Sequence, residues 1–290
     1  MSDAIGAPGR KAVCWLCPHR CHLSDGQTGF CRARQNQGGI IRSLSYGLLT
    51  SAALDPIEKK PLYHFRPGSM ILSLGSFGCN LRCPFCQNYT ISQAGRDGFE
   101  GQQLPMDRTS PKEIVAAAQR LEETSGNIGV AFTYNEPLVG YEFVYDTARL
   151  LKEAGLVVVL VTNGQIEKDP WLHLLPYVDA VNIDLKGFTQ SFYDWIGGDL
   201  KTTKAAIEMA AEQGIHVEVT TLVIPGRNDR DEEMAAEAEW LAGLSAELPL
   251  HLSRYFPRYL SDIPMTPAET LQRLRRIAGT RLRFVHLGNV

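Results

Sequence analysis

The stretch GCNLRCPFCQN, at residues 78 to 88, contains Cys79, Cys83 and Cys86, three of the seven cysteines in the chain. Three thiols are one too many for a disulfide and one too few for a closed tetrahedral metal site. A cubane 4Fe-4S cluster takes one thiolate on each of its four irons, so a loop with three thiolates leaves one iron open for chemistry. The alternative is a zinc ion held by these three thiolates and a histidine such as His64.

A second group of cysteines lies near the N-terminus with the spacing Cys-x2-Cys-x3-Cys-x9-Cys. It consists of Cys14, Cys17, Cys21 and Cys31 and accounts for the remaining four. Four thiolates form a closed set, which suits either a structural zinc ion or a second 4Fe-4S cluster. We therefore predict one metal centre here, and the spacing leaves zinc and the second cluster as open alternatives.

Six short apolar segments rich in β-branched residues alternate with amphipathic segments. The predicted strands are 71–77, 128–133, 156–162, 180–185, 216–224 and 250–255. A helix is predicted at 111–123, with Ser110 as its cap and Pro111 in its first turn, and another at 203–214 that ends at Gly214. This alternation indicates parallel βα units, and so an α/β fold with a wound sheet or a partial barrel. Residues 1–70 lack the rhythm and form a predicted Cys-rich module, which leaves 71–290 as the main domain.

The composition limits which cellular compartment and which classes of partner are expected. The 290 residues are 44% hydrophobic and carry a net charge of −3, which gives no general attraction to nucleic acid. The N-terminus has no apolar signal segment, and the longest aliphatic run, at 156–161, is far shorter than a membrane span. We therefore expect a cytoplasmic protein without a membrane partner. In that compartment clustered cysteines indicate metal or redox chemistry more often than disulfides.

Polar motifs follow successive predicted strands: TYNEP at 133–137, VTNG at 161–164 and NIDLKG at 182–187. Each has a structural explanation, namely a helix start at Glu136, a turn at Asn163 and an exposed ion pair at 184–186. Parallel α/β folds, however, gather their active sites at the carboxyl ends of their strands, so we expect these motifs to meet the cysteine loop.

The last predicted strand brings His251, Arg254 and Tyr255. They are candidates for a substrate pocket, although core or rim packing explains each of them equally well.

The cysteine spacing, with Phe85 before the third cysteine, resembles the cluster loop of the radical S-adenosylmethionine (SAM) superfamily. The stretches at 55–69, 132–137 and 220–229 extend this resemblance to the radical SAM component of the AmmeMemoRadiSam system, a relative of the pyruvate formate-lyase activating enzymes. The resemblance covers nearly the whole chain. It implies a partial (β/α)6 TIM-type barrel of the radical SAM type, with cluster and SAM at its C-terminal mouth.

The resemblance also implies a reaction. The open iron would chelate SAM, and the reduced cluster would cleave it to methionine and a 5′-deoxyadenosyl radical that abstracts hydrogen from a substrate. The substrate is either a glycine backbone in a partner protein, as for the activating enzymes, or a small molecule or RNA handled with Memo-like and AMMECR-like proteins. The electron donor would be a flavodoxin or ferredoxin. The alternative of another class is a zinc-binding interaction module without catalysis.

The implied SAM contacts are Phe85, Thr133, Tyr134, Asn135, Glu136, Asn163, Asp184 and Lys186. In the resemblance Glu136 receives the SAM ammonium and Asn163 lies near the ribose or carboxylate. Val161 stands where many relatives carry an acid of a monovalent-cation site, so no such cation is expected. Family members continue past the LGN at 287–289, and the chain is therefore expected to be a short variant or a truncation.

Overall fold

One eight-stranded sheet organises the computed structural model, which describes residues 10–95 and 104–290. Its order is β14-β13-β12-β11-β10-β9-β7-β6, and every neighbouring pair is parallel except β6 and β7. The strands are β6 (Ser51–Pro56), β7 (Met70–Gly75), β9 (Asn127–Phe132), β10 (Val157–Thr162), β11 (Ala180–Asp184), β12 (His216–Val223), β13 (Leu250–Arg254) and β14 (Val285–Gly288). β14 and β6 do not pair with each other, so the barrel is partial, as predicted.

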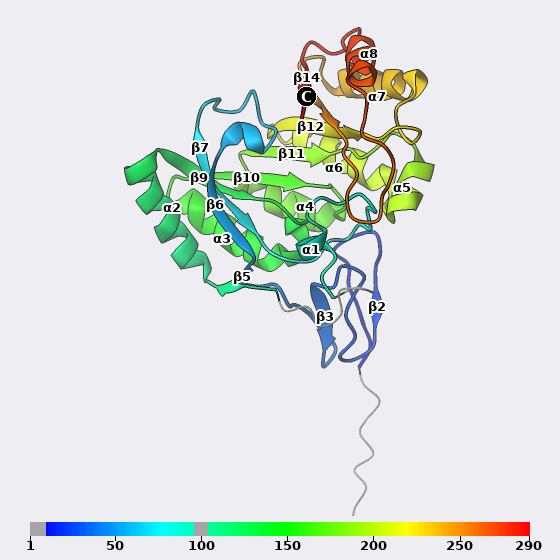
Figure 1. The fold of residues 1–290 in the computed structure, drawn as a ribbon. Helices are drawn as coiled ribbons and strands as arrows, with labels where there is room; N and C mark the ends of the chain where they lie inside the picture. Colours follow the sequence, from blue (N-terminus) through cyan, green and yellow to red (C-terminus); the bar gives the residue numbers. More distant parts are fainter. Residues whose placement is uncertain (1–9, 96–103) are drawn as a thin grey trace, which may run out of the picture.

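Helices connect the parallel strands (Figure 1). They are α1 (Tyr89–Ser92), α2 (Pro111–Ser125), α3 (Tyr141–Glu153), α4 (Lys168–Leu174), α5 (Gln190–Ile196), α6 (Leu200–Glu212), α7 (Asp231–Leu244) and α8 (Ala268–Ala278), with 3-10 turns η1 (Ile57–Lys59), η2 (Pro137–Gly140) and η3 (Leu175–Tyr177). The predicted start of α2 is confirmed, because Ser110 and Glu113 form a reciprocal capping box. In the described part of the chain, no helix is long and apolar enough to cross a membrane.

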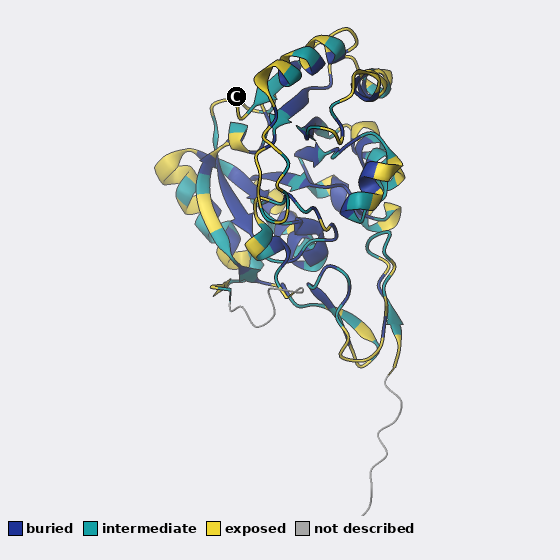
Figure 2. Ribbon diagram, turned by 45° about the vertical axis from the view of Figure 1, so that its right-hand side comes forward, coloured by how far each residue is buried: buried dark blue, intermediate teal, exposed yellow. Residues whose placement is uncertain are grey.

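The strands of the sheet are largely buried (Figure 2), and apolar side chains pack on both of its faces, as expected for parallel strands. Along β10, Val158 and Leu160 pack with residues of the surrounding helices in the main core. Val157 and Val159 point to the other face and pack against apolar residues of 57–62 that follow β6. The segment after β6 therefore fills part of the inner face of the partial barrel.

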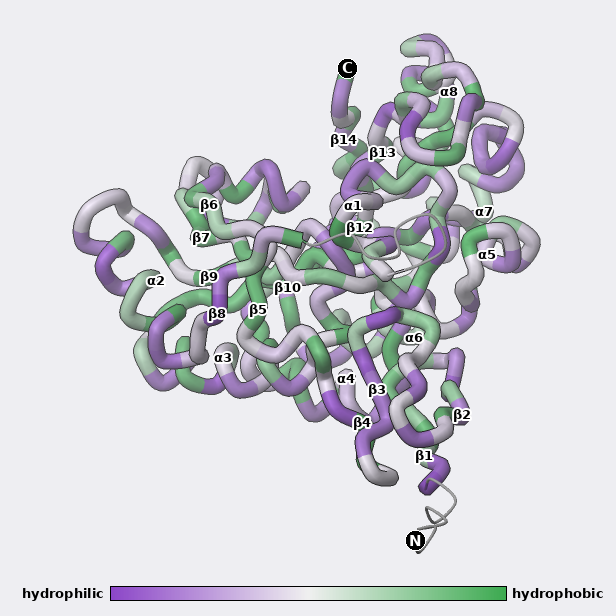
Figure 3. Tube along the Cα trace, turned by 60° about the horizontal axis from the view of Figure 1, so that its bottom comes forward, coloured by the Kyte–Doolittle hydropathy of each residue, from purple (hydrophilic) through white to green (hydrophobic). Residues whose placement is uncertain are grey.

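Short strands make up the N-terminal part. β1 (Ala12–Val13) pairs with β2 (His22–Leu23), and β3 (Arg34–Gln37) pairs with β4 (Ile40–Ser43). β5 (Leu48–Leu49) pairs with β8 (Asp107–Arg108). Figure 3 shows β1 to β4 gathered beside the sheet, with β3 largely hydrophilic. The boundary at residue 70 stays a prediction, and residues 51–56 before it pair with β7 in the large sheet.

All six predicted strands are present, as β7 and β9 to β13. The sequence prediction missed β6 and β14, which form the two edges of the sheet. β6 reads SAALDP and β14 reads VHLG. Polar residues, proline and glycine are tolerated at a sheet edge, so neither segment shows the apolar pattern of a central strand.

Candidate functional site

A cavity of about 770 Å³ lies at the carboxyl ends of the parallel strands. Its walls come from the loop after β7 and from the ends of β9, β10 and β11, with further residues of β12, β13 and the segment after β6. Every residue of the predicted cluster and SAM sites lines it: Cys79, Cys83, Phe85, Cys86, Thr133, Tyr134, Asn135, Glu136, Asn163, Asp184 and Lys186. The fold thus brings together motifs that lie far apart in the sequence.

Side-chain amides fix the cysteine loop to the neighbouring strand ends. Asn135 accepts a hydrogen bond from the Ser76 amide (2.9 Å) and donates to the Gly78 carbonyl (3.0 Å). Asn163 donates to Oδ1 of Asn80 (2.9 Å), and Asn80 donates to the Gln165 carbonyl (2.7 Å). The sequence analysis gave Asn80 no role, although it lies inside the quoted cysteine motif.

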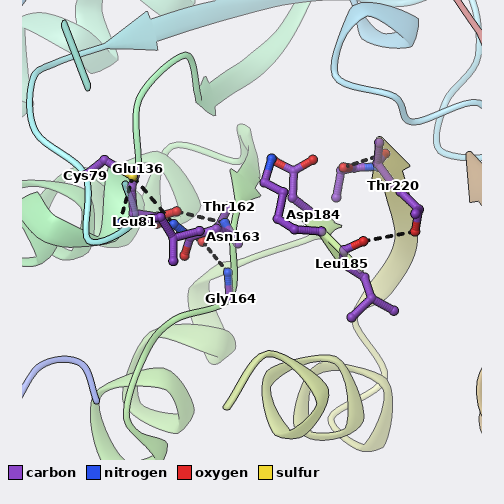
Figure 4. A network of polar contacts seen from close by, with 12 residues as sticks. Cys79, Leu81, Glu136, Thr162, Asn163, Gly164, Asp184, Leu185 and Thr220 are labelled. Atoms are coloured by element: carbon purple, nitrogen blue, oxygen red, sulfur yellow. Dashed lines mark hydrogen bonds and ion pairs between the residues drawn. The ribbon is translucent and has the colours of Figure 1, made fainter. Parts of the chain in front are cut away.

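The geometry at Cys79 tests whether a cluster fits. The Leu81 amide (3.4 Å) and Nδ2 of Asn163 (3.7 Å) both donate to its Sγ (Figure 4). Such bonds stabilise a thiolate and tune an iron-sulfur cluster. Burial raises the pKa of the Cys79 thiol, and it raises that of Cys83 to about 12, so in the absence of a metal both remain thiols.

Within residues 10–95 and 104–290, no three His, Cys, Asp or Glu side chains lie close enough together to hold a single metal ion. A cubane binds each thiolate to a different iron, which separates its ligands more widely than one ion does. The three cysteines on one cavity-lining loop, with two amide donors to the Cys79 sulfur, fit a cluster, whereas the Cys3His zinc alternative would need His64 as its fourth ligand. His64 of that alternative lies instead against His286, with 2.8 Å between their Nε2 atoms.

Glu136 is buried at the end of β9. Its Oε1 accepts from the Leu138 amide (3.0 Å) and from Oγ1 of Thr162 (2.7 Å), and its Oε2 accepts from the Asn163 amide (2.8 Å). Burial raises the pKa of Glu136 to about 7, although these three hydrogen bonds oppose the shift. The carboxylate caps η2, so the helix-start interpretation is correct, yet it also lines the cavity. One position on Oε2 remains for a cationic ligand.

Asp184 and Lys186 form an ion pair of 2.8 Å at the end of β11. Their side chains are 28% and 18% exposed, so the pair is largely enclosed in the cavity wall rather than on the open surface. Burial alone would lower the pKa of Lys186, but the charge and the hydrogen bond of Asp184 act against burial, and the pKa is raised. The ammonium group is therefore a permanent positive charge beside the cysteine loop.

Tyr134 has φ of +72°, a left-handed backbone that is costly for a residue with a side chain. Its hydroxyl donates to Asp55 (2.6 Å), and Nζ of Lys60 lies 2.8 Å from the same carboxylate oxygen. Lys60 is only 2% exposed and lies 4.8 Å from the Tyr134 ring centre. Burial would raise the pKa of Asp55, but its donors hold it far below the usual value. The sequence analysis quoted the stretch with Asp55 and Lys60 without giving either a role.

The remaining candidates divide between the cavity and the core. Phe85 packs in a buried aromatic cluster with Phe192 and Tyr255, so its side chain supports the loop as well as lining the cavity. Tyr255 donates to Ser261, and Arg254 donates to the Thr266 carbonyl, and neither lines the cavity. His251 does line it.

The four N-terminal cysteines also lie near one another. Burial raises the pKa of the Cys17 thiol to about 12, and Cys31, Cys14 and Cys21 add to the shift. The segment packs against the cysteine loop of the barrel. His19 lies 2.8 Å from the Asn80 carbonyl, and Gly78 (φ +87°) has no room for a side chain because a Cβ atom would lie 2.6 Å from the Cys31 carbonyl oxygen. The metal at these cysteines stays a prediction.

The radical SAM superfamily model matches residues 74–238, which contain the cysteine loop and the ends of β9, β10 and β11. This chain belongs to the radical SAM superfamily. Membership implies a 4Fe-4S cluster and SAM as cofactors, in agreement with the donor set of the cavity.

Among curated proteins, an uncharacterized protein of Methanocaldococcus jannaschii is 42% identical to this chain. The match covers 97% of this chain and 82% of the related protein. The pyruvate formate-lyase 1-activating enzyme of Escherichia coli K12 is 28% identical over 53% of this chain and 61% of the enzyme. The chain thus matches about three fifths of the length of that enzyme.

Solved structures agree on the fold. A radical SAM methyltransferase from Sphaerobacter thermophilus has a TM-score of 0.55 at 19% identity. The match covers 77% of this chain and 67% of the methyltransferase chain. QueE from Escherichia coli has a TM-score of 0.53 at 15% identity. The match covers 84% of this chain and 93% of the QueE chain.

Proposed function

We propose that this radical SAM protein is an enzyme that binds its cluster through Cys79, Cys83 and Cys86 and binds SAM in the same cavity. The bound cluster would supply the electron that cleaves SAM to methionine and a 5′-deoxyadenosyl radical, which abstracts hydrogen from the substrate. The observation that carries the proposal is the convergence of the cysteine loop and three strand-end motifs on one cavity.

The chain's own residues would hold SAM by charge and shape. Glu136 offers a buried carboxylate oxygen to the ammonium of the methionine part, and Lys186 offers a positive charge to its carboxylate. Asn163 links the two sites, because its amide donates to Glu136 while its side chain reaches Cys79. Thr133, Tyr134, Asn135 and Asp184 complete the proposed contacts.

A glycine backbone in a partner protein is the first candidate substrate, on the similarity to the pyruvate formate-lyase activating enzymes. A small molecule is the second, because the cavity has polar lining residues on β12 and β13 beyond the proposed cluster and SAM contacts. Because the radical takes a hydrogen atom from the substrate, deuterium from a labelled substrate would appear in 5′-deoxyadenosine. Size fractions of a deuterated cell extract would therefore show whether the deuterium comes from a protein or from a small molecule. Loss of the deuterium signal after ribonuclease treatment would indicate an RNA substrate.

A flavodoxin or ferredoxin would deliver the electron, and Memo-like and AMMECR-like proteins are proposed as partners. The reducing cytoplasm suits free thiols that ligate a cluster. At Cys14, Cys17, Cys21 and Cys31 the proposal remains one centre, either zinc or a second cluster.

Iron and sulfide analysis of anaerobically purified protein, with a 5′-deoxyadenosine assay under dithionite, tests the proposal. We expect at least about four irons and four sulfides per chain, and SAM cleavage that depends on the reductant. Glu122→Gln, an exposed change on α2 outside the cavity, is the control and should retain both. Protein that contains zinc without sulfide and leaves SAM intact would be the non-catalytic zinc module instead.

A further inference from the structure

Four of the seven histidines in the chain lie around one buried carboxylate, Glu218. His216 is on the same strand, β12, and His251 and His286 are paired neighbours on β13 and β14. His64 comes from the segment after β6, and its Nε2 lies 2.8 Å from Nε2 of His286. None of these residues belongs to the proposed cluster or SAM contacts.

Glu218 has no exposed side-chain surface, and both of its oxygens are fully used. Oε1 faces Nε2 of His216 (2.9 Å) and accepts from the His64 amide (2.8 Å). Oε2 faces Nε2 of His251 (2.6 Å) and accepts from the Tyr63 amide (3.0 Å). Burial would raise the pKa of Glu218, but these donors together hold it well below its usual range. Glu218 is thus an ionised group that can only accept.

The tautomer of His251 follows from this contact. Because an ionised carboxylate has no proton to give, Nε2 of His251 carries the hydrogen of their bond. Nδ1 is then the free nitrogen, and no partner for it occurs among the residues that the structure describes. The ring cannot easily turn, because Tyr63 meets it edge-on at 4.7 Å and His286 stacks on it at 5.1 Å.

His251 borders the cavity from a strand that supplies none of the proposed SAM contacts. Those contacts come from the cysteine loop and the ends of β9, β10 and β11, whereas His251, Thr220 and Ser253 come from β12 and β13. Tyr63 lines the cavity from the segment after β6. The cavity therefore has a polar region whose residues are not among the proposed cluster or SAM contacts.

We propose that this region is the substrate subsite and that Nδ1 of His251 is its hydrogen-bond and proton acceptor, with Glu218 as the positioning residue. The inference rests on the proposed function. The ligand class is a substrate whose polar group presents an N–H or O–H to Nδ1. When the proton transfers, the N–H or O–H bond breaks, an N–H bond forms at Nδ1, and the Glu218 carboxylate balances the imidazolium charge. No electron enters or leaves at His251.

A metal ion is the alternative occupant of a histidine cluster. It is disfavoured because both oxygens of Glu218 are already occupied by hydrogen bonds and leave no free lone pair for an ion. Zinc titration of the anaerobic holoenzyme tests this alternative: stoichiometric binding that His286→Asn removes would overturn the proposal.

Long-range 1H–15N NMR on the histidine-labelled holoenzyme tests the tautomer, with His251→Asn to assign the signal. The titrating or charged groups that face this imidazole are Glu218, His216, His286, His64 and Tyr63. We expect the Nε2–H tautomer in the parent protein, and a mixture of the two neutral tautomers in Glu218→Gln, because the glutamine amide can either accept from or donate to Nε2. An Nδ1–H tautomer in the parent protein would overturn the proposal, even if Glu218→Gln does not fold.

Carbethoxylation by diethyl pyrocarbonate, read by mass spectrometry, tests access to His251 with SAM present. Because the subsite is separate from SAM, saturating SAM should slow the modification of His251 less than about twofold, and exposed His173 serves as the control. Complete protection by SAM would place His251 in the cofactor site and refute the subsite. SAM affinity is measured in the same samples, so that failure of the subsite proposal can be told apart from failure of the proposed function. The His251→Asn variant should bind SAM like the parent protein. If the parent protein itself does not bind SAM, the proposed function is refuted.

Discussion

The loop with Cys79, Cys83 and Cys86 and the segment with Cys14 to Cys31 are held by different means. The loop is tied by the side chains of Asn135 and Asn163, which belong to the ends of sheet strands. The N-terminal segment has two-residue strands and local bonds such as that from the Cys14 amide to the Cys21 carbonyl (3.0 Å). The barrel therefore dictates the geometry of the loop, whereas the segment has little apolar material, and we expect its fold to depend on the metal predicted at its thiols.

Replacing Cys83 with alanine should have the largest effect on chemistry and little effect on the fold. The variant leaves one iron without a thiolate, so we expect SAM cleavage to fall below detection. Circular dichroism should still report a folded barrel, because Cys83 lies outside the main core and packs in a smaller cluster with Leu81 and Phe85. Production of 5′-deoxyadenosine at the parent rate would refute the role of this loop.

Cys17→Ser should affect the N-terminal segment and leave the barrel loop intact. We expect loss of one metal centre and proteolysis within residues 10–40, while the barrel cluster survives. A fall from about eight irons per chain to about four indicates a second cluster, and about four irons in both proteins with loss of zinc indicates a structural zinc. If neither metal changes and the segment resists protease, the four cysteines do not form a site.

Glu136→Gln should weaken SAM binding without removing the cluster. The substitution keeps the shape of the side chain but removes a charge-assisted hydrogen bond of about 1.5 to 3 kcal/mol, so affinity should fall roughly 10- to 150-fold. Glu58→Gln, at a carboxylate that lines the cavity from η1, is the matched control. Unchanged SAM affinity in calorimetry, with lower thermal stability, would leave Glu136 as a helix cap alone.

Glu237→Gln should change barrel stability and neither metal centre. Burial raises the pKa of Glu237 to about 8, although Thr221 donates to it. The protonated carboxyl therefore favours the folded state fully below about pH 4.5, and this contribution is lost as the pH rises through about 8. We expect the variant to gain about 1 to 3 kcal/mol over the parent at pH 8 and to lose this slope in denaturant titrations. Parallel pH curves would contradict the assignment.

Much of the site could be predicted because its residues lie in local motifs. Three cysteines in eight positions and polar residues at strand ends are visible without a fold, and parallel strands bring such ends to one edge. Asp55, Lys60 and Glu218 were missed because their significance depends on contacts across the barrel. Glu218, for example, lies inside an otherwise ordinary strand and gains its role only from residues 63, 64, 216 and 251.

The left-handed backbone of Tyr134 is a local cost that its side chain offsets. Tyr134→Gly would relieve a conformational cost on the order of 1 kcal/mol. The same change would delete the hydroxyl that donates to Asp55 and the ring beside Lys60, both at the cavity wall. Because a hydrogen bond to a charged group contributes about 1.5 to 3 kcal/mol, the loss exceeds the relief, and the strained backbone persists because the side chain binds the cavity wall together.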